Sequence, residues 1–134
     1  MYTALEDGER VCYIVSYPKK KSKHYKTNRK PYIMVIYVDK KADEVSVTSG
    51  FRYYNEPVIL NIDKKVKYTL PIIQEDFAWT ECTKTDQELI IEMKQGLSME
   101  VNGKTNEATT VDDTYSLLGF KKAYQKMHNL CHIK

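Results

Sequence analysis

"PVILNIDKKVKYTL", residues 57–70, is the stretch of this chain that decides its fold. Its two halves are rich in β-branched and aromatic residues, and they flank the step Asp63-Lys64. In the second half, apolar residues alternate with lysine or threonine, which is the period of a strand with one buried face. The stretch therefore predicts an antiparallel hairpin. Lys64 leaves the type of turn open, because tight turns favour glycine.

Strands are also predicted on the N-terminal side of this hairpin. "VCYIVSY" at 11–17 and "PYIMVIYVD" at 31–39 have the same composition, and we interpret the polar run between them as a loop. "EVSVTSG" at 44–50 alternates strictly, with its valines on one face and Ser46 and Thr48 on the other. This pattern predicts a half-buried strand.

On the C-terminal side, "DFAWT" at 76–80 predicts a further short strand. Asn102-Gly103 lies between extended segments and predicts a second hairpin, whose partner strand runs through "ATTVDDTYS" at 108–116. Asp112 and Asp113 are adjacent on that strand and point to opposite faces, so they do not form an acid/base pair. We interpret them as turn or edge residues.

Two helices are predicted. "TDQELIIEMKQG" places Thr85 at an N-cap, Glu88 at the capping-box position and Gly96 at the stop, which predicts a helix over 86–95. "GFKKAYQKMHNLC" predicts a C-terminal amphipathic helix, because apolar residues recur at helical spacing: Phe120, Tyr124, Met127 and Cys131, with Ala123 and Leu130 beside them. Many short strands with these two helices predict a mainly β fold, an antiparallel β-sandwich that forms a single domain over 1–134.

Composition excludes several classes of function. The chain has 134 residues and a net charge of only +3, far from the charge of a dedicated nucleic-acid-binding protein. Its apolar runs, such as "YIMVIYV" at 32–38, are far shorter than the about 18 residues of a membrane-spanning helix. The first ten residues show no secretory signal. We therefore expect no nucleic-acid partner and no transmembrane segment.

Signatures of catalysis and of metal binding are missing as well. The chain has no GxSxG elbow, HExxH helix, Walker loop or GxGxxG motif, so we expect no enzymatic activity and no cofactor. His128 and His132 have the spacing of two metal ligands, but no third ligand accompanies them. We interpret them as side chains that compensate the helix dipole, and we expect no metal site. Trp79 and the pair Tyr53-Tyr54 are interpreted as packing residues, with a ligand surface as the alternative.

An ordered set of motifs resembles a known family. The motifs are "ERVCYIVSYPKK" at 9–20, "NRKPYIMV" at 28–35, "DEVSVTSGF" at 43–51 and "DTYSLLGFKKA" at 113–123. Together they resemble the invasion-associated locus B family of alphaproteobacteria, over nearly the whole chain. The sequence departs from the family pattern at Lys30, at Lys64 and in an extra cysteine, Cys82.

The resemblance implies an immunoglobulin-like sandwich in an exported protein whose leader has been removed. It also implies a place in the periplasm or at the outer membrane, or release from the cell, and a link to virulence through invasion of host cells. In such an oxidising compartment cysteines can pair. The resemblance favours a disulfide between Cys12 and Cys131, with Cys82 left over. The alternatives are a Cys12 to Cys82 link and three free thiols.

The basic stretch 17–32 is the most highly charged part of the chain. Its cations are candidates for binding an acidic partner such as a sulfated glycan, phospholipid heads or lipopolysaccharide. They are Lys19, Lys20, Lys21, Lys23, Lys26, Arg29 and Lys30. The alternative is a solvated loop whose charge keeps a sheet edge from aggregating.

Two functions follow from these expectations. The first is a non-enzymatic protein of the cell envelope that presents the loop 19–30 to an acidic component of a host-cell surface or of the envelope. The second is a periplasmic structural or stress-related accessory protein that binds another bacterial protein and has no direct role at the host.

Overall fold

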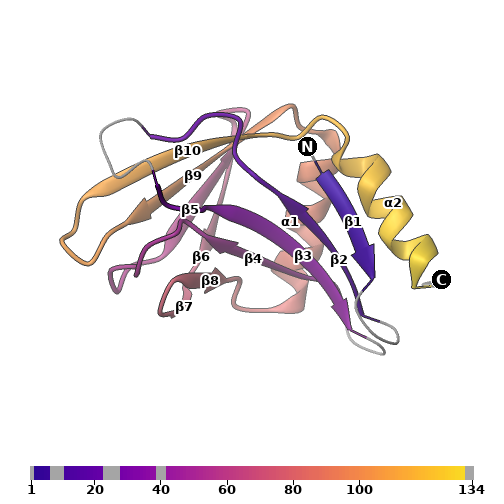
Figure 1. Cartoon of the computed structure of the whole chain (residues 1–134), viewed down its shortest axis with the longest axis horizontal. Coiled ribbons are helices and arrows are strands. Elements are labelled where there is room, and N and C mark those ends of the chain that lie inside the picture. The colour runs from indigo at the N-terminus through magenta and orange to yellow at the C-terminus, as the bar shows by residue number, and fades with distance from the viewer. Residues whose placement is uncertain (1, 7–10, 23–27, 39–41, 132–134) are drawn as a thin grey trace.

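The computed structural model describes residues 2–6, 11–22, 28–38 and 42–131. Within these ranges the chain forms two β-sheets and two helices (Figure 1). In chain order the elements are β1 (Tyr2–Glu6), β2 (Val11–Ser16), β3 (Tyr32–Val38), β4 (Glu44–Thr48), β5 (Val58–Ile62), β6 (Val66–Leu70), β7 (Ile72–Gln74), β8 (Phe77–Trp79), α1 (Thr83–Gln95), β9 (Ser98–Lys104), β10 (Thr110–Ser116) and α2 (Phe120–Leu130).

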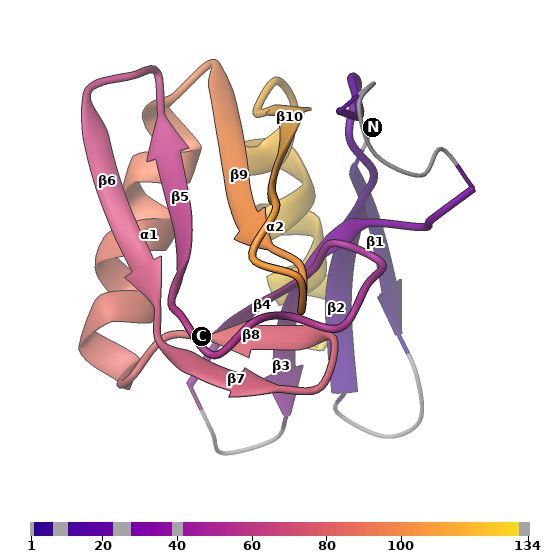
Figure 2. The ribbon, with the colours of Figure 1, turned by 90° about the vertical axis from the view of Figure 1, so that its left-hand side faces the viewer.

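The strands divide into a large sheet, in the order β1-β2-β3-β4-β8-β7, and a small sheet, in the order β10-β9-β5-β6. Every pair of neighbours is antiparallel. Both helices lie behind the small sheet in Figure 2. The helix α2 packs against β1 and β2, and α1 packs against α2 and β4. The predicted mainly β antiparallel sandwich, with one internal and one C-terminal helix, is confirmed.

The apolar core draws on both sheets and both helices. It contains residues from alternating positions of the strands and from one face of each helix, among them Ile14, Val35, Leu60, Met93 and Phe120. In α2 Phe120, Ala123 and Met127 are buried, as the helical spacing predicted, whereas Tyr124 and Leu130 of the same predicted face are only half-buried. Burial of such side chains is the main favourable contribution to folding.

The hairpin predicted at Asp63-Lys64 is confirmed, because β5 pairs with β6 from Ile62–Val66 outward. Asp63 and Lys64 both adopt left-handed backbone conformations, with φ of 52° and 58°. The Asp63 carboxylate accepts hydrogen bonds from the backbone N–H groups of Leu97 and Ser98, at 3.1 and 2.9 Å. These bonds stabilise a turn that contains no glycine.

The second hairpin is present, but its predicted turn is wrong. Asn102 and Gly103 lie inside β9, and the connection to β10 runs through 105–109. A Cβ atom on Gly103 would lie 2.8 Å from Cε1 of Tyr53. The glycine is needed here because an aromatic ring approaches the strand closely, and not because the chain turns.

The prediction of a half-buried β4 is also wrong. Ser46 and Thr48 are each only 2% exposed, so both faces of the strand are covered. On the large sheet Ser46 lies between Met34 and Trp79, and Thr48 lies between Tyr32 and Phe77. The large side chains of neighbouring strands cover the small polar ones.

The helix α1 begins earlier than predicted. Cys82 occupies its N-cap position, and among the described residues no side chain caps the helix there. Thr85 lies inside the first turn and donates a hydrogen bond to the Glu81 carboxylate, so Thr85 is not the N-cap. Asp86 is buried and accepts a hydrogen bond from the backbone N–H of Val45 in β4, at 3.1 Å. This bond ties the start of the helix to the large sheet.

Candidate functional site

The connection between β2 and β3 carries the basic residues that the sequence singled out. Lys19, Lys20 and Lys30 are exposed. Lys21 is half-buried, and its Nζ donates to the backbone oxygen of Arg29 at 3.5 Å. Lys23 and Lys26 lie outside the described residues. The described part of the connection therefore presents a group of lysines, which we call the lysine segment: Lys19, Lys20, Lys21 and Lys30.

The lysine segment is attached to the small sheet. The backbone N–H groups of Lys19 and Lys20 donate to the Thr114 oxygen at 2.9 and 3.2 Å. In return, the N–H of Thr114 donates to the Lys20 oxygen at 2.8 Å. A connection that leaves the large sheet at β2 is thus hydrogen-bonded to β10 of the other sheet.

The Asp113 carboxylate is hydrogen-bonded to both described parts of this connection, at Ser22 and at Arg29. Its Oδ1 accepts a hydrogen bond from the backbone N–H of Ser22 at 3.0 Å. The Arg29 guanidinium donates to both carboxylate oxygens, at 2.6 and 2.5 Å, and to the backbone oxygen of Ser49 at 3.0 Å. A bidentate pair of this kind is a strong, directional contact.

The prediction that Arg29 is a partner-binding cation needs correction for this reason. Arg29 is 6% exposed and Asp113 is 1% exposed, so the charge of Arg29 is neutralised inside the protein. Asp113 does lie on an edge strand, β10 of the small sheet, as the sequence indicated, but its side chain is buried and paired. Breaking a buried pair leaves an unpaired charge and typically costs about 3–5 kcal/mol of stability. Both residues position the lysine segment and do not belong to its exposed surface.

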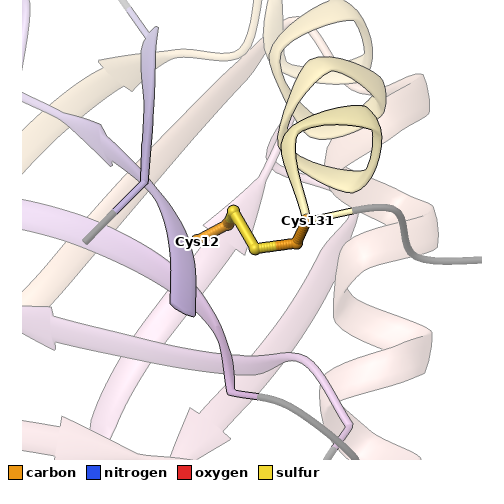
Figure 3. Close-up of a disulfide and its surroundings, with 2 residues drawn as sticks. All are labelled: Cys12 and Cys131. Carbon is orange, nitrogen blue, oxygen red and sulfur yellow. A yellow bond between two sulfur atoms is a disulfide. The ribbon is translucent and has the colours of Figure 1, made fainter. Parts of the chain in front are cut away.

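A disulfide joins Cys12 to Cys131, at a sequence separation of 119 residues (Figure 3). Cys12 lies in β2 and Cys131 directly follows α2, with a Cα–Cα distance of 6.1 Å. This is the pairing that the family resemblance favoured. Cys82 is exposed and free. The bond attaches the C-terminal helix to the large sheet.

A second polar cluster lies between the helices and the start of β4. The Tyr124 hydroxyl donates to Oδ2 of Asp43, and Nε2 of His128 lies 3.0 Å from the same oxygen. The Nζ of Lys94 lies 4.0 Å from the centroid of the Tyr124 ring, which is a cation–π distance. Burial, and then Asp43, raise the pKa of Tyr124 above its usual range, so the hydroxyl stays neutral and keeps donating.

The sequence did not reveal this cluster, since Tyr124 was expected only as a core residue. The signal available was the spacing of Tyr124 and His128, four residues apart on one face of a helix. Together with Tyr37, Ile90 and other residues the cluster lines a cleft of about 430 Å³. His132, the other histidine considered as a metal ligand, lies outside the described residues. Within the described ranges no group of three His, Cys, Asp or Glu side chains could hold a metal ion.

The outer face of the large sheet is apolar and only partly covered. Side chains from β2 and β3 and from the residue after β2 line a shallow groove of about 340 Å³ on this face: Val11, Tyr13, Val15, Tyr17, Tyr32, Met34 and Ile36. A series of rings continues from it, with centroid distances of 6.4 Å for Tyr17–Tyr32, 6.1 Å for Tyr32–Phe77 and 6.0 Å for Phe77–Trp79. Trp79 thus packs on this face.

The pair Tyr53-Tyr54 divides between the interior and the surface. Tyr53 is buried, and its hydroxyl is hydrogen-bonded to Oγ of Ser49 at 2.7 Å. Burial raises the pKa of Tyr53, which keeps the hydroxyl neutral. Tyr54 is 40% exposed. Tyr53 is therefore a packing residue.

None of the described helices has the length and apolarity to cross a bilayer.

Comparisons with known proteins identify a family and a similar fold. A family model described as invasion associated locus B (IalB) protein matches residues 3–128. Among solved structures, the crystal structure of invasion associated protein b from Bartonella henselae is similar to this chain, with a TM-score of 0.70 and 15% sequence identity. The similarity covers 96% of this chain and 92% of that one, and at this identity it shows the fold alone. No curated protein sequence matches.

Proposed function

Because the chain belongs to the invasion associated locus B family, as its motifs indicated, we propose that it is a non-enzymatic protein of the bacterial cell envelope that binds an acidic partner through its lysine segment. The observation that carries this proposal is the attachment of the lysine segment to β10 and to the buried Asp113. A segment that is already ordered loses less conformational entropy on binding. Lys19, Lys20 and Lys30 then face water in a preset arrangement.

The partner class that fits this arrangement is a sulfated glycan of a host-cell surface. Lysines act as point charges that attract a polyanion and displace its counterions. Such binding needs clustered cations and no deep pocket. It would also link the lysine segment to the invasion that gives the family and its Bartonella member their names.

The non-enzymatic part of the proposal is supported by the roles of three carboxylates, of which Asp113 and Asp86 are buried and Asp43 is half-buried. Asp113 pairs with Arg29, Asp86 accepts from the backbone of β4, and Asp43 accepts from Tyr124. Each of these groups already performs a structural task. A catalytic acid or base instead needs a free position facing a substrate.

The place in the cell envelope is supported by the disulfide between Cys12 and Cys131. Disulfides form and persist in the periplasm, at cell surfaces and outside cells, and they are rare in the reducing cytosol. Surface biotinylation of intact bacteria tests the localisation. If only lysed cells yield labelled protein, the protein does not reach the host and the glycan partner is untenable.

Binding to immobilised heparin at increasing salt tests the lysine segment. In the triple variant K19S/K20S/K30S, affinity at 0.1 M salt should fall on the order of a hundredfold, at about 1 kcal/mol for each lysine at an anionic surface. The control variant K67S/K84S/K126S removes the same charge from other exposed positions and should bind nearly as the unchanged protein does. Equal losses in the two variants would show that only net charge matters and would defeat the proposal.

The apolar outer face of the large sheet favours a second candidate function, an accessory protein of the periplasm that binds another bacterial protein. Met34 lies in β3, one of the two strands that line the shallow groove. A photo-cross-linker placed at Met34 should then form a discrete adduct in living bacteria, and one at Ile59 on the small sheet should not. The protein found in this adduct should co-purify with the unchanged chain, and the change Met34→Lys should abolish that co-purification. Identical cross-linking from both positions would reject this candidate.

A further inference from the structure

Two leucines of this protein are largely in water and lie close together. Leu97 is 65% exposed and Leu118 is 69% exposed. Leu97 belongs to the connection between α1 and β9, and Leu118 belongs to the connection between β10 and α2. The backbone N–H of Leu117 donates to the oxygen of Leu97 at 2.9 Å, so the two connections are hydrogen-bonded to each other.

The backbone that carries these leucines is held firmly. The Asp63 carboxylate of the β5–β6 turn accepts from the N–H of Leu97 at 3.1 Å. Gly96 is packed so closely that an added Cβ would lie 2.8 Å from Cδ1 of Leu117 and 2.7 Å from Cγ2 of Ile62. In Figure 2 the three connections meet at the upper end of the molecule. The exposure of the leucines is therefore imposed by an ordered structure.

Lysines surround the two leucines. Lys94, Lys121 and Lys122 line the same open cleft, of about 440 Å³, together with Leu97 and Leu118. Lys64 is exposed in the β5–β6 turn. The described residues that line this cleft include no carboxylate. The nearby Asp63 is hydrogen-bonded to backbone N–H groups.

The first turn of α2 adds to the positive potential. Helices favour acidic side chains in this turn, because the unpaired N–H groups there carry a positive partial charge. Here Lys121 and Lys122 occupy it, and the described first turn contains no acidic residue. This arrangement is unfavourable in water and becomes favourable next to a negatively charged surface.

We propose that this end of the molecule docks on an anionic lipid bilayer. The docking surface consists of Leu97 and Leu118, which enter the boundary between headgroups and acyl chains, and of the exposed lysines that contact the acidic headgroups: Lys64, Lys121 and Lys122. Exposed apolar side chains ringed by lysine are the composition that binds at a membrane interface. The surface is distinct from the lysine segment, and its occupant is not the glycan proposed above.

Vesicle co-sedimentation of the oxidised full chain tests the proposal. The probes are vesicles of phosphatidylcholine alone and vesicles containing about one third phosphatidylglycerol. The unchanged protein should bind only the anionic vesicles. The double variant L97S/L118S should lower the partition constant about a hundredfold, since burying each leucine contributes about tenfold. K121Q/K122Q should lower it about twenty-fivefold, at about fivefold for each lysine.

Matched control variants distinguish binding through this surface from nonspecific adsorption and from binding through the lysine segment. I72S/I91S removes two other exposed apolar side chains, and K67Q/K84Q removes two other exposed lysines. Both should change binding less than about twofold. K19S/K20S/K30S should lose heparin binding and keep vesicle binding, and L97S/L118S should do the opposite. Thermal unfolding of each variant checks that it remains folded.

Several results would overturn the proposal. The first is that the unchanged protein fails to bind anionic vesicles, and the second is that I72S/I91S weakens binding as much as L97S/L118S does. Equal binding to neutral and anionic vesicles would show that the lysines do not contribute to binding. Self-association without lipid that disappears in L97S/L118S would assign the surface to a second copy of the chain.

Discussion

The two helices of this protein are fixed to the large sheet by different means. The internal helix α1 uses buried apolar side chains and a hydrogen bond that the backbone N–H of Val45 donates to Asp86. The C-terminal helix α2 uses apolar side chains too, but adds a disulfide at Cys131 and the bonds of Tyr124 and His128 to Asp43.

The difference follows from the positions of the helices in the chain. Strands precede and follow α1 after short connections, so the chain on both sides restricts its motion. Of the described elements, none follows α2. The disulfide and the polar contacts of α2 therefore restrain a helix that has a described strand on one side only, whereas α1 has described strands on both sides.

The largest effect should come from removing the disulfide. The double variant C12S/C131S should lower the free energy of unfolding by about 4–5 kcal/mol, because the bond closes a loop with a sequence separation of 119 residues. Urea unfolding measures the change, and limited proteolysis should then cut α2 before α1. The control C82S removes the exposed thiol and should leave stability unchanged. Cleavage of α1 before α2 would contradict the conclusion that the disulfide restrains α2.

The apolar contacts of the two helices should respond differently to reduction. Leu89→Ala in α1 and Met127→Ala in α2 each empty a fully buried site and should cost about 3 kcal/mol in the oxidised protein. After reduction, Leu89→Ala should cost the same and Met127→Ala should cost less, because α2 has already loosened. Urea titrations with and without a reductant measure this. Ile91→Ala, at an exposed position of α1, is the control and should cost under about 0.5 kcal/mol.

The polar contact of α2 should contribute less than its apolar contacts. Tyr124→Phe keeps the ring and removes the hydroxyl that donates to Asp43, so the free energy of unfolding should fall by about 1–2 kcal/mol. Tyr37→Phe alters a tyrosine of the same cleft without removing a bond to Asp43 that the structure describes, and it serves as the control. An equal loss in both variants would mean that the bond to Asp43 does not stabilise α2.

The smallest effect should come from the polar contact of α1. Burial raises the pKa of Asp86 above its usual value near 3.8, although the Val45 N–H opposes this. An acid with a raised pKa in the folded state makes the protein lose stability as pH rises from the unfolded pKa through the folded pKa. Asp86→Asn should remove this loss, so the variant should gain stability relative to the unchanged protein between pH 4 and pH 7. Urea unfolding at pH 4 and at pH 7 measures the difference in free energy of unfolding between the variant and the unchanged protein. The same difference at both pH values would contradict a raised pKa for Asp86.

Much of the fold was predictable because it depends on neighbouring residues. The hairpin around Asp63 and the buried face of α2 follow from alternation and from helical spacing, which are local patterns. The candidate site was predictable only in part. The exposed lysines follow from composition, but the roles of Asp113 and Asp43 do not, because each binds side chains that are distant in the sequence.

The amino-acid sequence by itself determined the class of the fold, the approximate positions of most strands and both helices, and the place of the basic residues in a connection. Only the tertiary structure decided which residues are exposed and which are paired. Arg29 resembles its lysine neighbours in the sequence, yet it is buried against Asp113, 84 residues away. Gly103 resembles a turn residue, yet it makes room for the ring of Tyr53. Periodicity reports the face on which a side chain lies, and only the assembled sheets bring its distant partner to that face.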